Sequence, residues 1–375
     1  TITVNLPVGA AGSSVAMVDY AGTWQTNNVT VNANGSEKIG GVAAAATLET
    51  QGQSVTFVYI DGTQGWVNVL DSTSYVRGAS YIVATGGTPC SGAIVCTNYK
   101  VHTFTGPGTL CVSASGNPAG SNTVDYIVVA GGGGGGGVRA GGGGAGGYRE
   151  SSGTTTGCYT VSPLGSGVSA LPVTATGYPI AVGGGGTGGP GPPTAAISGV
   201  NSTFSSITSA GGGAGGNEGQ PPATSGAKDG GSGGGSAQCG VVPGVTSGNT
   251  PPVSPPQGSN GGASGCAPVY GAGGGGGAST IGGDGCSSTA AGVGGSGNAN
   301  SITATPVTRG GGGGGGTYLG RGSAGAGGPG GGGAGTTGSG ATNGTAELGG
   351  GGGGGGTGCG GNGGDGVVII RYKFQ

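Results

Sequence analysis

Side chains that could carry out acid–base or metal chemistry are few in this chain and lie far apart in the sequence. His102 is the single histidine among 375 residues, so a metal site with two histidine ligands is excluded. A Ser-His-Asp triad would have to use this residue, which lies in an alternating stretch at 99–104. Alternation predicts a strand, with Val101 and Thr103 on one face and His102 and Phe104 on the other. We therefore expect His102 to be a half-buried structural residue.

The carboxylates are scattered singly along the chain, whereas a glycosidase needs two of them at close range. The acids that stand apart in this way include Asp19, Glu37, Asp61, Asp125, Glu150 and Asp284. No pair among them is suggested by the sequence, so we expect the protein not to be an enzyme.

Glycine-rich nucleotide-binding motifs carry no information in this composition, because the chain contains 109 glycines. A phosphate-binding loop with Lys before Ser or Thr is not formed, since Lys228 is followed by Asp229. With one histidine a Cys/His zinc site is not expected either. The sequence therefore indicates no cofactor and no metal.

The chain contains eight cysteines, an even number that favours disulfides in an oxidising or extracellular setting. Eight cysteines allow 105 connectivities, so the pairing cannot be read from the sequence. Cys90 and Cys96 bracket a short loop and are the first candidates for a local bridge. Two further candidate pairs are Cys239 with Cys266 and Cys286 with Cys359.

Large side chains placed among glycines are the candidates for binding. Aromatic residues and arginine are enriched where binding energy concentrates. The residues of this kind are Tyr270, Tyr318, Arg321, Tyr148, Arg149 and Arg139. The alternative for each tyrosine is that it covers the end of a glycine-rich body without contacting a partner.

Composition limits the classes of partner. Only 6% of residues are charged and the formal net charge is −2, so the basic patch of a nucleic-acid-binding protein is missing. No stretch of 18 or more apolar residues is present, and we expect no membrane insertion. A disordered linker of this length would normally be rich in charge, which favours packed glycine over free glycine.

Two β-rich regions are expected before the glycines. Residues 1–78 contain short alternating stretches, and the segments 55–60 and 66–70 flank a Gly-bearing loop typical of a hairpin. Residues 79–130 read as a connecting β-sheet region that ends in the apolar stretch 124–129. Residues 367–375 provide a closing strand.

The glycine-rich region 131–366 is predicted to be folded. Glycine weakens strands, helix costs about 1 kcal/mol per Gly relative to Ala, and collagen requires Gly at every third position. Polyproline II geometry remains, and glycine can adopt it without side chains that keep neighbouring helices apart. A run of seven residues would span about 22 Å. The sequence therefore predicts a bundle of packed polyglycine II helices joined by loops, with no α-helix of note, and a fibrous protein with an all-β N-terminal part.

The N-terminal segment resembles repeats of phage tail fibres, in particular those of marine tailed phages. The resemblance is carried by TVNLP (3–7), DYAGTW (19–24), NVTVNANGS (28–36) and VYIDGTQGWV (58–67). It covers roughly the first 70 residues.

The rest of the chain resembles the glycine-rich domain of phage tail-fibre adhesins and tip proteins. The motifs are VHTFT (101–105), VDYIVVAG (124–131), GAGGYR (144–149), NSTFSSI (201–207), VTRG (307–310) and GVVIIRY (366–372). The resemblance implies a polyglycine II bundle whose exposed end carries loops that recognise host surface receptors. Eight cysteines and the Pro-rich insertion around 251–256 depart from the family pattern.

Together the resemblances imply a tail-fibre or tip protein of a virion. The expected partners are two further copies in a homotrimer, other tail or fibre proteins, and a glycan or protein receptor on the host surface. One alternative is a structural subunit of an extracellular filament or virion surface without a receptor. Another is an ice-binding protein, which requires a flat, regularly spaced face of small residues.

Overall fold

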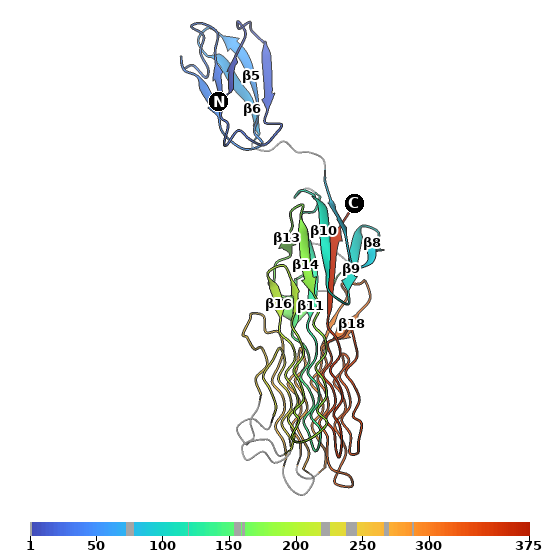
Figure 1. Ribbon diagram of the computed structural model, residues 1–375. Coiled ribbons are helices and arrows are strands. Elements are labelled where there is room, and N and C mark those ends of the chain that lie inside the picture. The colour runs from blue at the N-terminus through green and yellow to red at the C-terminus, as the bar shows by residue number, and fades with distance from the viewer. Residues whose placement is uncertain are drawn as a thin grey trace. The chain divides into compact units, whose positions relative to one another are not determined.

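The computed structural model describes residues 2–72, 79–118, 120–153, 159, 162–218, 226–237, 246–265, 270–286 and 289–375. The chain divides into two compact units, Thr1–Gly78 and Ala79–Gln375 (Figure 1). The described secondary structure is all-β apart from one 3-10 turn, η1 (Pro163–Gly165). No helix within the described ranges is long and apolar enough to cross a membrane.

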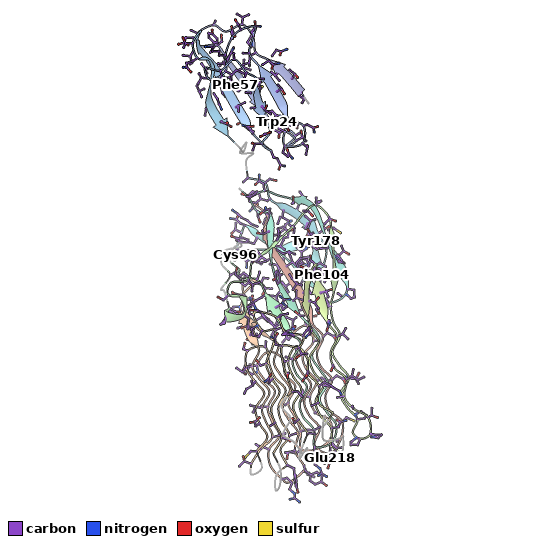
Figure 2. All side chains as sticks on the ribbon, turned by 90° about the vertical axis from the view of Figure 1, so that its left-hand side faces the viewer. Trp24, Phe57, Cys96, Phe104, Tyr178 and Glu218 are labelled. Atoms are coloured by element: carbon purple, nitrogen blue, oxygen red, sulfur yellow. The ribbon has the colours of Figure 1, made fainter. Side chains whose placement is uncertain are left out.

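The first unit is built from two three-stranded sheets that enclose one core. One sheet has the order β1 (Ile2–Asn5), β3 (Val29–Asn32), β4 (Ala46–Leu48), and the other β2 (Ser14–Val18), β5 (Ser54–Asp61), β6 (Gly65–Ser72). Trp24 and Phe57, labelled in Figure 2, are buried in this core together with Trp66. The hairpin predicted around the Gly-bearing loop is confirmed, and the Asp61 carboxylate holds its turn by accepting the N–H groups of Thr63 and Gln64.

The second unit begins with two sheets, and the last strand of the chain lies at the centre of one of them. The strands of this unit are β7 (Ile82–Thr85), β8 (Thr88–Val95), β9 (Tyr99–Phe104), β10 (Gly108–Ser115), β11 (Thr123–Val129), β12 (Tyr148–Glu150), β13 (Leu171–Pro172), β14 (Gly177–Ala181), β15 (Ser202–Phe204), β16 (Ile207–Ser209), β17 (Asn298–Asn300), β18 (Val307–Arg309) and β19 (Val367–Lys373). One sheet has the order β12-β11-β19-β9-β8, with β13 also on β11, and the other β16-β15-β14-β10-β7. Strands β17 and β18 form a separate hairpin.

Strand β19 joins the two ends of the glycine-rich region. It lies between β11 and β9, and Val129 pairs directly with Val367. The chain therefore leaves the sheet at Val129 and returns opposite the same point, so the glycine-rich region is an insertion between two paired strands. The sequence indicates three separate regions, at residues 79–130, 131–366 and 367–375. In the structure they lie in one compact unit.

The glycine runs form rods that lie side by side below the sheets of this unit (Figure 1). Along the rod at 141–147, successive N–H groups donate to three different rods in rotation. Gly141 and Gly144 donate to the carbonyls of Gly216 and Gly213, at 3.0 and 2.8 Å. The residues between them donate to two other rods: Gly142 to Gly273, Gly143 to Gly352, Ala145 to Gly276 and Gly146 to Gly349.

This rotation has a period of three residues, as polyglycine II geometry requires, because each residue turns the backbone by a third of a circle. The prediction of packed polyglycine II helices is confirmed. The partner numbers fall along one neighbouring rod and rise along another, so the rods run in both directions and are not all parallel.

Glycine is required where a rod is enclosed by other rods on every side. A Cβ atom on Gly143 would lie 2.1 Å from the carbonyl oxygen of Gly133, and one on Gly351 would lie 1.9 Å from that of Gly143. On the outside this restriction is lifted at every third residue, the one that faces solvent. Along the outer rod, Gly183, Gly186 and Gly189 are buried, whereas Thr187 and Pro190 are exposed.

Replacing one inner glycine should distinguish the packed rods from a flexible linker. We expect Gly143→Ala to destabilise the protein by about 3 kcal/mol, because the methyl group meets backbone that cannot move aside. Gly184→Ala is the matched control, since the nearest atom to its added Cβ lies 3.7 Å away. This variant should change the free energy of unfolding by less than about 0.5 kcal/mol. Denaturant unfolding checks both, and equal effects would contradict the packing.

Candidate functional site

Loops join the rods at the end of the bundle that lies away from the sheets, and Figure 2 labels Glu218 there. Backbone hydrogen bonds hold these loops to one another. The Arg139 N–H donates to the Gly356 carbonyl at 2.9 Å, and the Glu218 N–H donates to the Val138 carbonyl at 3.2 Å. The Asn217 side chain accepts from the Gly137 N–H and donates to the Thr194 carbonyl, both at 2.6 Å. The loops therefore present their side chains from a braced surface.

Three side chains from three loops meet at this end. Arg139 Nη1 lies 3.1 Å from Glu218 Oε1, and the Arg139 guanidinium lies 4.8 Å from the centre of the Tyr318 ring. Arg139 has a φ of 44°, a left-handed conformation that turns the chain sharply at the end of the first rod. The two charged side chains are each 29% exposed, so the pair contributes little stability and stays accessible.

The neighbouring turn adds exposed residues to this group. The Arg321 N–H donates to the Tyr318 carbonyl at 3.0 Å, which fixes the turn between them. Tyr318 and Leu319 are 40% and 66% exposed, and Arg321 is exposed as well. We define Arg139, Glu218, Tyr318, Leu319 and Arg321 as the distal loop cluster. The sequence indicated three of its members. It missed Glu218, a lone acid, and Leu319, an aliphatic residue.

Tyr270 lies at the same end, because Ala272 donates to the carbonyl of Gly316, the residue before Thr317 and Tyr318. Its ring is half-buried and its φ is 56°.

Tyr148 and Arg149 do not belong to the exposed end, and this prediction is wrong. Both lie in β12, which pairs with β11 at the end of the bundle next to the sheets. We call this end the base of the bundle. The Tyr148 side chain is 1% exposed and its hydroxyl donates to Glu150 at 2.7 Å. Arg149 Nη1 donates to the Thr208 carbonyl at 3.4 Å. The second glycine rod runs back toward the sheets, so the residues that follow it are packed in the protein.

Two of the three disulfide candidates are also wrong. Cys96 is disulfide-bonded whereas Cys90 is a free thiol, so the two are not paired. Cys359 is a free thiol, so it does not pair with Cys286. Cys90 lies within β8 and Cys96 directly follows that strand, so the two cysteines are joined by strand rather than by the short loop that the prediction assumed. Cys239 and Cys266 lie outside the described residues.

His102 is completely buried, not half-buried as predicted. Its Nδ1 lies 2.7 Å from the Gly86 carbonyl oxygen and its Nε2 lies 3.0 Å from the Tyr372 hydroxyl. Burial lowers the pKa of His102. Both ring nitrogens are occupied by structural partners, which leaves neither for a triad.

A buried group of polar side chains lies where the rods meet the sheets. We define Tyr148, Glu150, Tyr159, Ser162, Asn298 and Asn300 as the basal polar cluster, and all six are at least nine-tenths buried. The Glu150 carboxylate accepts hydrogen bonds from Tyr148, Ser162, Asn298 and Asn300. Burial raises the pKa of Glu150 to about 7, and these donors limit the rise. The sequence showed Glu150 only as an isolated acid.

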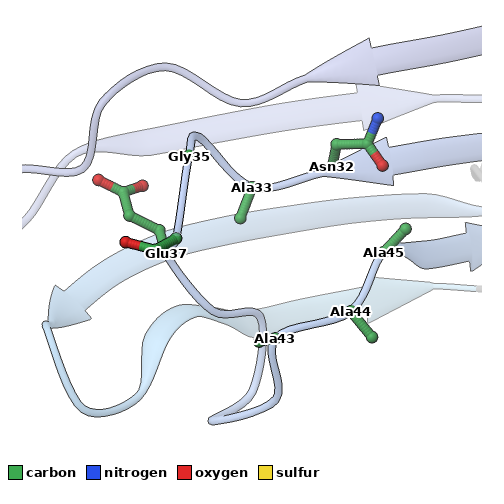
Figure 3. Close-up of a pocket in the computed structure, with 8 residues that line it drawn as sticks. Asn32, Ala33, Gly35, Glu37, Ala43, Ala44 and Ala45 are labelled. Carbon is green, nitrogen blue, oxygen red and sulfur yellow. The ribbon is translucent and has the colours of Figure 1, made fainter.

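The first unit contains a concavity of about 270 Å³, lined by Asn32, Ala33, Gly35, Ser36, Glu37, Ala43, Ala44 and Ala45 (Figure 3). Its single charged group already has structural partners. The Glu37 carboxylate accepts from the Gly9 N–H at 2.8 Å and from the Trp66 indole N–H at 3.2 Å. Its walls are otherwise small side chains, which offer a ligand few contacts. Across the described ranges no three His, Cys, Asp or Glu side chains gather as metal ligands would.

Glu150 makes stability depend on pH. Because its folded pKa of about 7 exceeds the ordinary value of 4.5, its stabilising contribution is complete below pH 4.5 and is lost as the pH rises through 7. We expect the free energy of unfolding to fall by about 3 kcal/mol over that window. Glu150→Gln should remove this slope.

Thermal unfolding of both proteins from pH 4.5 to 8 measures the difference between them. The lowered pKa of His102 acts in the opposite direction, since that contribution is lost as the pH falls below about 6.5. His102 is present in both proteins, so the difference isolates Glu150. Parallel pH profiles would contradict the assignment.

Comparison with known proteins agrees with this architecture. No curated protein matches the chain. The family model for the glycine-rich domain matches residues 111–373, which extends from β10 through the whole glycine bundle to the end of β19. This match covers well over half of the sequence and both strands that close the insertion. The chain therefore belongs to the glycine-rich domain family.

Proposed function

We propose that the protein is a phage tail-fibre or tip protein that binds a receptor on the host cell surface through the distal loop cluster. The observation that carries the proposal is the meeting of Arg139 and Tyr318 with exposed Leu319 and Arg321 at one end of a rigid bundle. Aromatic and arginine side chains are those that most often dominate binding energy. Their loops are held in place before a partner arrives, which lowers the entropy cost of binding.

The glycine bundle would act as a rigid spacer in this function. Its rods are joined along their length by backbone hydrogen bonds of 2.7–3.1 Å. Such a body carries side chains mainly on its outside and at its ends, so binding specificity is confined to the loops. We place the protein on a virion, outside the cell, as a homotrimer with other tail or fibre proteins. The receptor is a surface glycan or a surface protein.

Adsorption of the purified protein to a panel of bacterial cells, marine strains included, tests the proposal. We expect Tyr318→Ala and Arg321→Ala each to weaken binding at least tenfold, about 1.4 kcal/mol, because each removes an exposed anchor. Lys228→Ala is the matched control, since Lys228 is an exposed cation outside the cluster, and it should bind as the unchanged protein does. Equal binding by all three variants would exclude the distal loop cluster.

A structural subunit of a filament or virion surface is the second candidate. Strand β8 supports it, because it forms one edge of its sheet and Ile94 is 63% exposed on it. Open edges of this kind pair with further chains.

Electron microscopy of the purified protein separates the two functions. Subunit addition through β8 predicts open-ended polymers that Ile94→Lys abolishes, because a charge on the edge opposes pairing. Thr105→Lys, at an exposed position beyond β9, is the control that should leave the polymers intact. Discrete particles of at most three chains would exclude the filament.

A further inference from the structure

Ser162 has the contacts of an activated hydroxyl. Its Oγ donates to Glu150 Oε1 and accepts from the side-chain amide of Asn298, with 2.9 Å between Oγ and Nδ2. The Leu164 N–H also donates to this oxygen, at 3.2 Å, and fixes its position at the start of η1. A hydroxyl becomes nucleophilic when a neighbouring base can take its proton.

The side-chain amide of Asn298 is within reach of that hydroxyl. Its carbon Cγ is one bond of about 1.33 Å from Nδ2, so Ser162 Oγ lies at most about 4.2 Å from Cγ. Rotation of the amide about its last side-chain bond brings the carbon toward the distance of about 3–3.5 Å from which attack occurs. Ser162 and Asn298 are 7% and 6% exposed, which excludes most water from the pair.

Glu150 is suited to move the proton. It contacts both reacting groups, since Asn298 Nδ2 also lies 3.3 Å from Oε1. Tyr148 and Asn300 hold its other oxygen. A carboxyl group whose pKa is close to neutrality can both accept and return a proton near pH 7.

Arg309 provides positive charge beside the amide. It pairs directly with Asn298 in the β17–β18 hairpin, which places the two side chains on the same face. The side chain is 6% exposed, and its Nε and Nη1 atoms have no hydrogen-bond partner among the described residues. Unused donors in a buried site stabilise negative charge that develops during a reaction.

We propose that Ser162 and Asn298 become joined by an intramolecular ester bond. Glu150 takes the proton of the Ser162 hydroxyl while Oγ attacks Asn298 Cγ, and the negative charge collects on the amide oxygen beside Arg309. When that intermediate collapses, the Cγ–Nδ2 bond breaks and Glu150 returns the proton to the leaving nitrogen. An alcohol and an amide thereby become an ester and ammonia, with no oxidant and no co-reactant. Ammonia diffuses away, which makes the step effectively irreversible.

The bond would join residues that are 136 positions apart in the sequence, at the base of the glycine bundle. It would fix the segment at η1 to the β17–β18 hairpin by a covalent link. In the described part of the chain a hydrogen bond from Asn298 to Ser162 and apolar packing join the two segments.

Intact mass of the purified, reduced full-length protein tests the bond. We expect a mass lower than the sequence value by about 17 Da, the mass of ammonia. After reduction and trypsin digestion, peptides 150–228 and 229–309 should remain joined, and hydroxylamine should separate them. Ser162→Ala, Glu150→Gln and Asn298→Asp should each restore the full mass expected for the variant, with circular dichroism to check that they fold. Ser166→Ala, at an exposed position after η1, should retain the loss.

Full mass in the unchanged protein would overturn the proposal. A loss of ammonia that persists in Ser162→Ala would overturn it as well, because cyclisation at any of the four Asn-Gly pairs, which begin at Asn34, Asn260, Asn343 and Asn362, gives the same mass change. The joined tryptic peptides distinguish the two chemistries even if a variant fails to fold, since cyclisation joins no separate peptides.

Discussion

The structure depends on one constraint, which is that the backbone groups of each glycine rod must be satisfied by other rods. An extended three-fold helix makes no internal hydrogen bonds, so a buried rod needs neighbouring rods on every side, for its N–H groups and for its carbonyls. Those neighbours can approach only if no side chain intervenes. Gly143 illustrates the consequence: it donates to one rod and accepts from another, and a methyl group would overlap a third.

The same constraint explains the polar residues at the margin of the bundle. Outer rods have sides on which no further rod lies, and side chains take its place. Asp365 accepts from the Gly185 N–H and Asn362 accepts from the Gly188 N–H, each at 2.8 Å. Short Asp and Asn side chains spaced three residues apart thus accept the N–H groups of an exposed rod that no backbone carbonyl reaches. This requirement accounts for Asp and Asn in a chain that otherwise has little charge.

How far the sequence reveals the fold follows from the same physics. The stretches 124–129 and 367–370 are apolar and isolated, so the two strands that border the glycine-rich region could be predicted, whereas their direct pairing emerged only from the structure. Packed polyglycine II geometry could also be predicted by eliminating the alternatives.

The end of the bundle at which each side chain lies could not be predicted, because the residues of a glycine run do not show whether the rod runs toward the sheets or away from them. Each rod crosses the bundle, so Arg139 follows a rod that runs away from the sheets and Tyr148 follows one that returns. Counting the reversals would have separated the two groups of candidates. The burial of Tyr148 depends on contacts between distant segments, which no local pattern records.

Side chains therefore concentrate at the two ends of the bundle, and the two ends differ in their electrostatics. At the distal end Arg139 and Glu218 remain partly in water, where an ion pair costs little to separate and a partner can compete for either member. At the base Glu150 is removed from water and needs every donor that surrounds it. Exposure suits recognition, because contacts can be exchanged, whereas burial suits fixed geometry and a shifted pKa. The loops that end the rods are the part of the fold least constrained by rod packing, and their sequences can change without disturbing it. The residues of the basal polar cluster lie where the rods meet the sheets, so a substitution there affects the packing of both.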